Sequence, residues 1–484
     1  MTSIQFGTDG WRGLLDRDLN DTTVARVAQA FADYWLEQAS APNDLAIAIA
    51  YDGRRRSQEF AQLFAQVLRG NEIRVVLSDR VVPTPVLSYA VKARCLNAGV
   101  MVTASHNPAA YNGIKFKANY GGPFFTEQTR AVERLLGQTQ PKLSDRPIQS
   151  DNLLAEYLDH LKQLVNLECI GQAQLHIVVD SMGGAGQTIL ADLLVPYGCR
   201  VETIDGVASP DFYQRSAEPI EKNLAPLMQR LQTDDRFSLG LATDGDGDRL
   251  GVVLDGGEWL SAQETILLLA DYVVNQKSLA GDLIKTSSVT DRLAAIAARA
   301  GRNIYDVQVG FKYICEEMIA RPIVFGCEES GGYGFGNHLP ERDGIVSALM
   351  LLELLATSGM ARLSNLVRLQ RQNLGEIFYD RVDLPCQSER YRELLPFLAN
   401  QGVQQIAAFP VTRAAEFHSS RNIINGLKFT LEGNPRWLLL RASETEPMLR
   451  IYAEGRSLNE VAALLTAGRE LLQTCEHRLD SLKA

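Results

Sequence analysis

Three aspartates alternate with glycines in the segment Asp244-Gly245-Asp246-Gly247-Asp248. Three carboxylates so close repel one another unless a cation lies among them, and the glycines let the loop curl so that all three face inward. Oxygen ligands select a hard ion, and Mg²⁺ would keep positions open for water or a phosphate oxygen. The spacing therefore predicts a magnesium site. An EF-hand loop would need Asp255 as its twelfth residue and a preceding helix, and no helical pattern precedes it. A solvated acidic turn would also account for the spacing.

A serine lies on a tight turn in the segment Thr103-Ala104-Ser105-His106-Asn107-Pro108. The apolar run 98–102 before it is typical of a short buried strand, and Pro108 ends regular structure. Ligands in open α/β sheets gather at such carboxyl ends of strands. With Lys115 following, the hydroxyl of Ser105 fits a nucleophile or a carrier of a phosphoryl group. An ordinary turn would use the same residue types, because they are common in turns.

Further polar loops could hold other parts of a substrate. Glu328 and Ser330, next to two glycines, could hydrogen-bond a polyol, and the glycine-rich segment 7–13 with Arg12 could approach an anion. A guanidinium and two hydroxyls, as a phosphate cradle requires, occur at Arg441, Ser443 and Thr445. In each case a plain turn or hairpin loop would have the same composition. Together, these loops predict an enzyme that transfers a phosphoryl group on a sugar phosphate.

The elements that must position these loops follow one pattern three times. Strands and helices alternate, with strands expected at 45–51, 73–77 and 98–102, then at 175–179, 200–204 and 238–242, and again at 283–286 and 323–325. This alternation indicates βαβ units with mixed, mainly parallel sheets, that is, three similar α/β modules. After about residue 370, strands at 427–431, 437–440 and 448–452 and a closing helix from 459 predict a C-terminal α+β domain. We also expect a helix with the apolar stripe Val24, Val27 and Phe31, capped by Asp21.

Composition limits the class of protein. A chain of 484 residues is too long for one core, and no apolar run reaches membrane-spanning length; the strongest, 348–356, contains Glu353 and suits a buried helix. The N-terminus has no signal-peptide pattern, and the seven scattered cysteines indicate reduced thiols. We therefore expect a cytoplasmic protein without a membrane partner. A net charge of −10 disfavours nucleic acid, although a local basic cleft can still bind an anionic substrate.

The motifs resemble, in order and together, those of the α-D-phosphohexomutase superfamily, which includes phosphoglucomutases and phosphomannomutases. The resemblance covers the whole chain and rests on the serine loop, the aspartate loop 244–249, the segment 328–332 and the segment 441–447, with the opening segment 7–13. It implies four domains around a central cleft. These would be domain 1 (1–145) with a phosphoserine loop, domain 2 (146–256) with the metal loop, domain 3 (257–370) with the sugar loop and domain 4 (371–484) with a phosphate loop.

The resemblance also implies roles for individual residues. Ser105 would be the phosphoserine, and its phosphate would join Asp244, Asp246 and Asp248 as a ligand of Mg²⁺. Lys115 would be a general acid/base, with Arg12 and His106 beside the transferred group. The residues expected to bind substrate are Arg249, Lys312, Glu328, Ser330, Arg441, Ser443, Thr445 and Arg450. Gly332 stands where some phosphomannomutases have histidine, which favours glucose.

The expected reaction is the interconversion of glucose 1-phosphate and glucose 6-phosphate, with mannose phosphates left open as substrates. Glucose 1,6-bisphosphate would be the intermediate and activator, and the protein a monomer or small homo-oligomer. Glu444 departs from the family loop, which usually has glycine or asparagine there; a carboxylate beside a phosphate is unfavourable unless it points away or pairs with a cation such as Arg450. Because of Glu444, a glucose-1,6-bisphosphate synthase that uses a donor such as fructose 1,6-bisphosphate remains an alternative function. A non-catalytic sugar-phosphate sensor also stays open, as does a phosphatase with an aspartate nucleophile.

Overall fold

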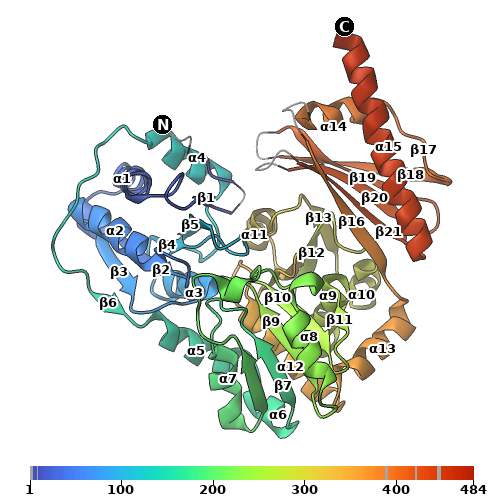
Figure 1. Cartoon of the computed structure of the whole chain (residues 1–484), viewed down its shortest axis with the longest axis horizontal. Coiled ribbons are helices and arrows are strands. Elements are labelled where there is room, and N and C mark those ends of the chain that lie inside the picture. The colour runs from blue at the N-terminus through green and yellow to red at the C-terminus, as the bar shows by residue number, and fades with distance from the viewer. Residues whose placement is uncertain (1–3, 8, 387–390, 420–421, 444–447, 484) are drawn as a thin grey trace.

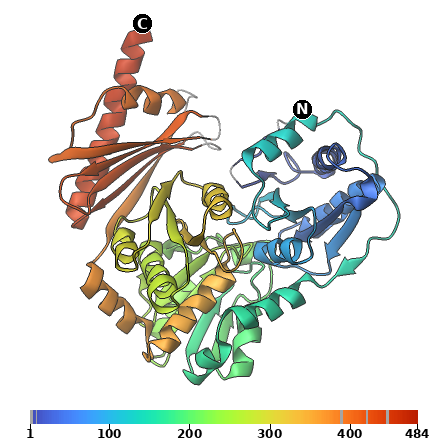
Figure 2. The same ribbon diagram turned by 180° about the vertical axis from the view of Figure 1, so that it is seen from behind.

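The structure is a computed structural model, and it describes residues 4–7, 9–386, 391–419, 422–443 and 448–483. The chain folds into three α/β domains and a C-terminal domain, each with its own sheet. Domain 1 and domain 4 lie at opposite sides of the molecule, with domains 2 and 3 between and beneath them (Figures 1 and 2). The long helix that ends the chain projects from domain 4, away from the other three domains.

Domain 1 has a mixed sheet with strands in the order β1-β5-β4-β2-β3-β6. Strands β4, β2, β3 and β6 are parallel to one another, whereas β5 is antiparallel to both β4 and β1. Its elements are β1 (Trp11–Leu14), α1 (Asp21–Leu36), η1 (Pro42–Asp44), β2 (Ala46–Tyr51), α2 (Ser57–Gly70), β3 (Arg74–Ser78), α3 (Thr84–Ala93), β4 (Ala98–Val102), β5 (Tyr111–Ala118), α4 (Thr126–Leu135) and β6 (Ser150–Asp151).

Burial explains why the central strands of domain 1 have continuous apolar sequences. Every residue of β2 and β4 is buried, as expected for strands with both faces covered. Helix α1 buries the stripe that includes Val24, Val27 and Phe31. The prediction that Asp21 caps this helix is wrong: Asn20 is the N-cap, and its Oδ1 accepts a hydrogen bond of 3.1 Å from the backbone N–H of Thr23. Asp21 lies one residue inside the helix.

Domain 2 begins with helices and continues into a mixed sheet in the order β11-β10-β9-β7-β8. Strands β7, β8 and β9 are parallel, and β10 returns antiparallel beside β9, so the loop between β9 and β10 is a tight connection. Its elements are α5 (Leu153–Leu164), α6 (Leu167–Gln172), β7 (His176–Asp180), α7 (Ile189–Leu194), η2 (Val195–Tyr197), β8 (Arg200–Ile204), η3 (Phe212–Gln214), η4 (Glu221–Asn223), α8 (Ala225–Gln232), β9 (Leu239–Thr243), β10 (Leu250–Leu254) and β11 (Trp259–Leu260).

Domain 3 has the sheet order β13-β12-β14-β15, with β15 antiparallel at one edge. The helix at 344–357, expected as a buried helix over 348–356, packs on α6 of domain 2 as well as on α9 and β15. Its elements are α9 (Ala262–Asp271), η5 (Tyr272–Gln276), β12 (Asp282–Thr286), α10 (Leu293–Arg299), β13 (Ile304–Val307), α11 (Phe311–Ala320), β14 (Ile323–Cys327), β15 (Tyr333–Phe335), α12 (Gly344–Thr357) and α13 (Leu363–Leu374).

Domain 4 is antiparallel throughout its described sheet, in the order β16-β21-β20-β19-β18-β17. Leucines on β20 and β21 pack under the helices α14 and α15, which gives this domain its own core. Its elements are β16 (Phe378–Pro385), α14 (Tyr391–Ala399), β17 (Gln405–Ile406), β18 (Phe409–His418), β19 (Ile424–Leu431), β20 (Trp437–Ala442), β21 (Met448–Gly455) and α15 (Leu458–Lys483).

The predicted fold class is confirmed, with three α/β domains followed by an α+β domain. The sequence patterns missed the antiparallel strands β5, β10 and β15, which make each of the first three sheets mixed. Strand β6 extends the first sheet to Asp151, past residue 145, and the domain boundaries as such stay a prediction. In the described part of the chain, no helix is long and apolar enough to cross a membrane.

Candidate active site

Ser105 is held in a strained backbone conformation directly after the buried strand β4. Its φ is +52°, a left-handed conformation that is uncommon for a residue other than glycine, and its side chain is fully buried. Its backbone N–H donates to Oγ1 of Thr103 at 2.8 Å. This turn directs the hydroxyl of Ser105 away from its own sheet and towards domain 2.

The aspartate loop of domain 2 meets Ser105 at that point. Oγ of Ser105 donates a hydrogen bond of 3.0 Å to Oδ2 of Asp244, although 139 positions separate the two residues. The loops approach so closely that a Cβ on Gly245 would lie only 2.4 Å from the carbonyl oxygen of Ser105. A side chain at position 245 would therefore separate the serine from the carboxylates.

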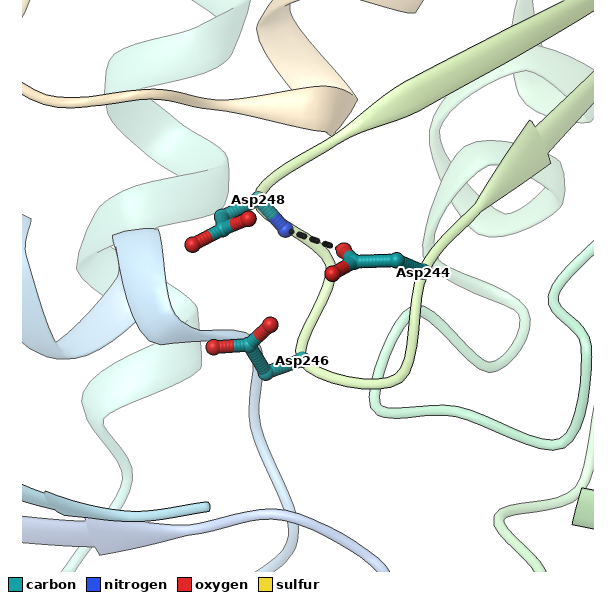
Figure 3. A group of neighbouring side chains, drawn as sticks. All are labelled: Asp244, Asp246 and Asp248. Atoms are coloured by element: carbon teal, nitrogen blue, oxygen red, sulfur yellow. Dashed lines mark hydrogen bonds between the residues drawn. The ribbon is translucent and has the colours of Figure 1, made fainter. Parts of the chain in front are cut away.

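The three aspartates converge on one point, as Figure 3 shows. All three are fully buried, and each offers a carboxylate oxygen within 4.8 Å of the others. Oδ1 of Asp244 accepts from the backbone N–H groups of Asp248 (2.9 Å) and Arg249 (3.1 Å), which curls the loop. Oδ1 of Asp246 and Oδ1 of Asp248 are buried and have no hydrogen-bond partner among the described residues. Buried carboxylate oxygens without a partner fit a hard divalent cation, so this group could bind a metal ion.

Lys115 is the first cation that balances these carboxylates. It lies on β5, beside β4, and its buried Nζ is 2.8 Å from Oδ2 of Asp246, 3.3 Å from Oδ2 of Asp248 and 2.9 Å from Oδ2 of Asp9. Burial alone would lower the pKa of Lys115, but Asp246, Asp248 and Asp9 raise it above the usual lysine value. Lys115 is therefore protonated at neutral pH.

Arg342 is a second cation, and none of the sequence motifs contains it. Its buried guanidinium donates to Asp9 and to Asp248, both at 2.8 Å, and to Oε2 of Glu328 at 3.3 Å. It thereby joins the metal loop to the sugar loop expected at 328–332. The only signal in the sequence was a charged run directly before the apolar helix α12, whose N-cap is Asp343.

Burial and the neighbouring charges shift the pKa values of the three-aspartate loop differently from residue to residue. Burial, together with Asp248 and Asp246, raises the pKa of Asp244 well above its usual range. Burial would also raise the pKa of Asp246, but Lys115 and the Thr84 hydroxyl, which donates to it at 2.6 Å, hold that pKa below the usual aspartate value. The pKa values of Asp244 and Asp246 are therefore shifted in opposite directions within one loop.

His106 and Arg12 lie beside the serine. Nδ1 of His106 is 3.3 Å from Oγ of Ser105, and burial, with Arg249 and Arg12, lowers the pKa of His106 well below its usual value. His106 is therefore neutral at pH 7. Nη1 of Arg12 donates to Oδ1 of Asn107 in the same loop at 2.5 Å. The structure thus places both residues beside the Ser105 loop.

The sugar-binding candidates occupy the end of β14. Burial raises the pKa of Glu328 to about 7, against the opposing effect of Arg342. Ser330 follows it and is half-buried. A Cβ on Gly332 would lie 2.3 Å from Cδ of Arg342, so the arginine occupies the space that a histidine side chain at 332 would need.

The phosphate-binding candidates are only partly within the described residues. Thr445 and Glu444 lie outside them, whereas Arg441 and Ser443 are buried at the end of β20. Nε of Arg450 is 3.6 Å from Oδ1 of Asp383. Arg249 extends from the metal loop, with Nη1 3.8 Å from Oε1 of Glu218.

A cavity of about 90 Å³ is lined by residues of domains 1, 3 and 4. Ser443 from domain 4, Lys312 from domain 3 and Thr126 and Arg130 from domain 1 line it. Nζ of Lys312 is 3.2 Å from Oγ1 of Thr126. The cavity therefore lies where a ligand could contact three domains at once.

Family models match nearly the whole chain. Phosphoglucomutase/phosphomannomutase domains I, II and III (alpha/beta/alpha) match residues 3–142, 155–257 and 261–372, and the C-terminal domain of the same family matches 398–470. The chain belongs to the phosphoglucomutase/phosphomannomutase family. It is therefore an enzyme, an intramolecular phosphotransferase of the phosphohexomutase group.

Individual relatives cover the chain from end to end but differ in name. A phosphoglucomutase/phosphomannomutase of Thermococcus kodakarensis is 26% identical over 97% of this chain and 98% of its own length. A phosphoglucosamine mutase of Limosilactobacillus reuteri is 30% identical, covering 93% of each chain. The crystal structure of a Thermus thermophilus protein assigned as a phosphomannomutase superimposes with a TM-score of 0.84 at 33% identity, covering 98% of this chain and 100% of that one. The family is shared, whereas the sugar differs among these relatives.

Proposed function

We propose that this phosphohexomutase interconverts glucose 1-phosphate and glucose 6-phosphate, with Ser105 as the carrier of the phosphoryl group. The observation that supports it most directly is the contact between Oγ of Ser105 and Asp244, with the Lys115 ammonium on the other two carboxylates of the loop. A nucleophile, a cation and an all-oxygen metal-binding group around one point suit phosphoryl transfer, in which positioning and charge neutralisation do most of the catalysis.

Asp244, Asp246 and Asp248 would hold Mg²⁺, with a phosphate on Ser105 as a further ligand. The buried Oδ1 atoms of Asp246 and Asp248, which have no hydrogen-bond partner among the described residues, fit that assignment. A bound Mg²⁺ would neutralise charge on the phosphoryl group.

In the forward direction, the bond between phosphorus and Oγ of Ser105 breaks as a bond to O6 of glucose 1-phosphate forms. We assign the proton relay to Lys115: its ammonium gives a proton to Oγ of Ser105, and the proton lost by the O6 hydroxyl restores it. The bisphosphate then turns over, and Ser105 accepts the phosphoryl group from O1, leaving glucose 6-phosphate. Glu328 and Ser330 would hold sugar hydroxyls, and Lys312, Arg441, Ser443 and Thr445 the phosphate that is not transferred.

The preference for glucose is supported by Gly332, where some phosphomannomutases have histidine; a Cβ at this position would lie 2.3 Å from Cδ of Arg342, so a larger residue would require the arginine to shift. Because relatives are named for mannose and glucosamine phosphates as well, the sugar needs a direct comparison. A panel of glucose, mannose and glucosamine 1-phosphates, each with a trace of the matching 1,6-bisphosphate, would rank them by kcat/KM. A higher kcat/KM for mannose or glucosamine would overturn the glucose assignment.

The first testable prediction concerns the carrier. Ser105→Ala removes the oxygen that takes the phosphoryl group, so we expect isomerisation to fall at least about 10³-fold and the phosphoprotein mass to disappear. Intact-mass spectrometry after incubation with glucose 1,6-bisphosphate measures the second effect. A variant that keeps its activity would favour an aspartate nucleophile instead. Glucose 1,6-bisphosphate accumulating from fructose 1,6-bisphosphate and glucose 6-phosphate, without fast isomerisation, would favour the synthase.

A further inference from the structure

The Ser105 loop is wrapped around one buried guanidinium, that of Arg54. Nη2 of Arg54 donates to the carbonyl oxygens of Ser105 and Asn107, both at 2.6 Å. Nη1 donates to the carbonyl oxygens of Pro108 and Tyr111, both at 3.0 Å. Only 3% of Arg54 is exposed. A single side chain therefore holds four carbonyls of the loop that carries the nucleophile.

The nearest countercharge of Arg54 is Asp52, also in domain 1. Its Nε lies 3.2 Å from Oδ2 of Asp52, which also accepts from Oγ1 of Thr103 at 2.6 Å. Thr103 in turn accepts from the backbone N–H of Ser105. A buried charge is stable only when it is paired and hydrogen-bonded, and Asp52 supplies the partner that Arg54 needs at this position.

The conformation of Ser105 explains why such a template is needed. A left-handed conformation at a residue other than glycine is unfavourable by about 1–3 kcal/mol and persists only when the surroundings enforce it. The φ of +52° at Ser105 is of this kind. Four hydrogen bonds from a rigid, planar guanidinium supply that enforcement, and a lysine could not reproduce their geometry.

A second strained turn, at residues 212–214 of domain 2, packs a phenylalanine ring against the guanidinium of Arg54. The guanidinium carbon lies 4.6 Å from the ring centroid of Phe212, which is completely buried. Phe212, Tyr213 and Gln214 have φ values of +53°, +53° and +63°, three successive left-handed residues without a glycine. No substrate-binding role has been assigned to this turn, and strain of this kind gathers at functional sites.

Phe212 also reaches the metal loop. A Cβ on Gly245 would lie 3.4 Å from Cε1 of Phe212, so the ring that contacts Arg54 also lies close to the aspartate loop. The turn is held at its start by Asp211, whose Oδ1 accepts from Oγ of Ser209 at 2.6 Å. After the turn, Arg215 forms ion pairs with Asp180 and Asp205. The turn is thus fixed at both ends and presses one ring into the junction of domains 1 and 2.

We propose that Arg54 is a positioning residue that fixes Ser105 against the metal loop, and that Phe212 clamps it there from domain 2. The proposal rests on the phosphoryl-carrier role of Ser105 proposed above. Loss of the guanidinium releases the Ser105 loop, so phosphoryl transfer slows. Binding of the hexose phosphate stays nearly the same, because the hydrogen bonds and ion pair of Arg54 in the described residues go to the loop and to Asp52.

The test compares Arg54→Gln, Arg54→Lys and Phe212→Leu with Arg55→Gln as the matched control. Arg55 is the next residue, and its exposed side chain pairs with Asp16 at 2.8 Å. For each folded variant, kcat and KM are measured with the hexose 1-phosphate that the wild type uses, together with the rate at which Ser105 takes up phosphate from glucose 1,6-bisphosphate.

We expect Arg54→Gln to lower kcat and the rate of phosphate uptake about 100-fold, since a displacement of about 1 Å has effects of that size, while KM changes less than about threefold. Arg54→Lys should recover only part of the loss, Phe212→Leu should lower kcat about tenfold, and Arg55→Gln should match the wild type. A folded Arg54→Gln enzyme with wild-type kcat, or with a changed KM alone, overturns the proposal. If Arg54→Gln does not fold, wild-type kcat in Phe212→Leu overturns it.

The variant Ser105→Ala separates this proposal from the one on which it rests. If Ser105→Ala keeps full activity, the carrier role itself is wrong. If Ser105→Ala is inactive and Arg54→Gln keeps the wild-type kcat, only the positioning role of Arg54 is overturned.

Discussion

At the scale of single residues, the site depends on buried charges that are paired across domains. Arg342 contacts Asp9, Asp248 and Glu328, which belong to three different domains. Neither Arg342 nor Asp9 was assigned a role from the sequence, because a single arginine or aspartate is usually a surface charge. Only their contacts show that they connect the Ser105 loop, the aspartate loop and the segment 328–332.

The ionisation of Glu328 gives a prediction at this scale. Burial raises its pKa to about 7, so the protonated form gains population as the pH falls through 7. If the carboxylate accepts hydrogen bonds from sugar hydroxyls, kcat/KM should fall about tenfold between pH 8 and pH 6, as titration of one group with that pKa requires. Glu328→Gln should lower kcat/KM at pH 8 and flatten this part of the profile. A profile that stays unchanged in the variant would assign the dependence to another group.

The same shift has a consequence for folding stability. The pKa of Glu328 is higher in the folded protein than the usual glutamate value of 4.5, so its contribution to stability is present below pH 4.5 and is lost as the pH rises through 7. The chain therefore keeps at position 328 a carboxylate that weakens the fold once it is ionised. A requirement for that carboxylate in binding would explain its retention.

At the scale of elements, the candidate active-site residues lie on short connections between neighbouring antiparallel strands. The metal loop joins β9 to the antiparallel β10, and the strand before it excludes the helix that an EF-hand requires. Asp255, the residue that an EF-hand would use, accepts hydrogen bonds from the backbone N–H of Ser364 (2.9 Å) and its hydroxyl (3.0 Å). It is thus engaged in structure and lies outside the aspartate group.

Metal binding by this loop is testable by thermal unfolding. Mg²⁺ at about 100 times its Kd should stabilise the protein by about 2.7 kcal/mol, and excess EDTA should reverse the rise in Tm and abolish isomerisation. Asp248→Asn removes one ligand and should remove most of the Mg²⁺-dependent rise. Asp255→Asn is the matched control, with a lower Tm but an unchanged rise on adding Mg²⁺. An unchanged rise in Asp248→Asn would place the ion elsewhere.

At the scale of the whole molecule, domain 4 is attached to domain 3 by polar contacts, some of them near the segment where the chain passes from one domain to the other. Nζ of Lys428 on β19 is 2.8 Å from Oδ1 of Asp291, and Glu454 on β21 accepts from Oγ1 of Thr290 at 2.9 Å. Arg292 donates to the carbonyls of Leu374 and Glu376, where the chain passes from α13 to β16. An apolar cluster of Val309 with Trp437, Leu439 and Tyr452 adds to these polar contacts, so domain 4 is held mainly by domain 3.

Closure of domain 4 onto the ligand should therefore be measurable in solution. The cavity shared by Ser443, Lys312 and Thr126 lies between domains 4, 3 and 1, so a bisphosphate bound there should draw the domains together. We expect small-angle X-ray scattering to show a smaller radius of gyration with glucose 1,6-bisphosphate and Mg²⁺, and no change with glucose, which lacks phosphate. An unchanged radius with saturating bisphosphate would contradict closure.

The sequence by itself determined the local features of this protein: the alternation of strands and helices, the aspartate loop and the serine turn. These follow from periodicity and turn chemistry over a few residues, which is why most central strands were predicted to within a residue or two. The antiparallel strands β5, β10 and β15 were missed because pairing direction depends on partners far along the chain.

Only the tertiary structure decided which charges meet. Ser105 and Asp244 lie 139 positions apart, and Arg342 lies 333 positions from Asp9, yet each pair is within hydrogen-bond distance. Burial in a common interior, together with the neighbouring charges, then shifts the pKa values of Asp244, Asp9 and Arg342, an effect that no local pattern encodes. The same packing places Phe212 of domain 2 against Arg54 of domain 1. Neither sequence segment alone predicts this contact between the two domains.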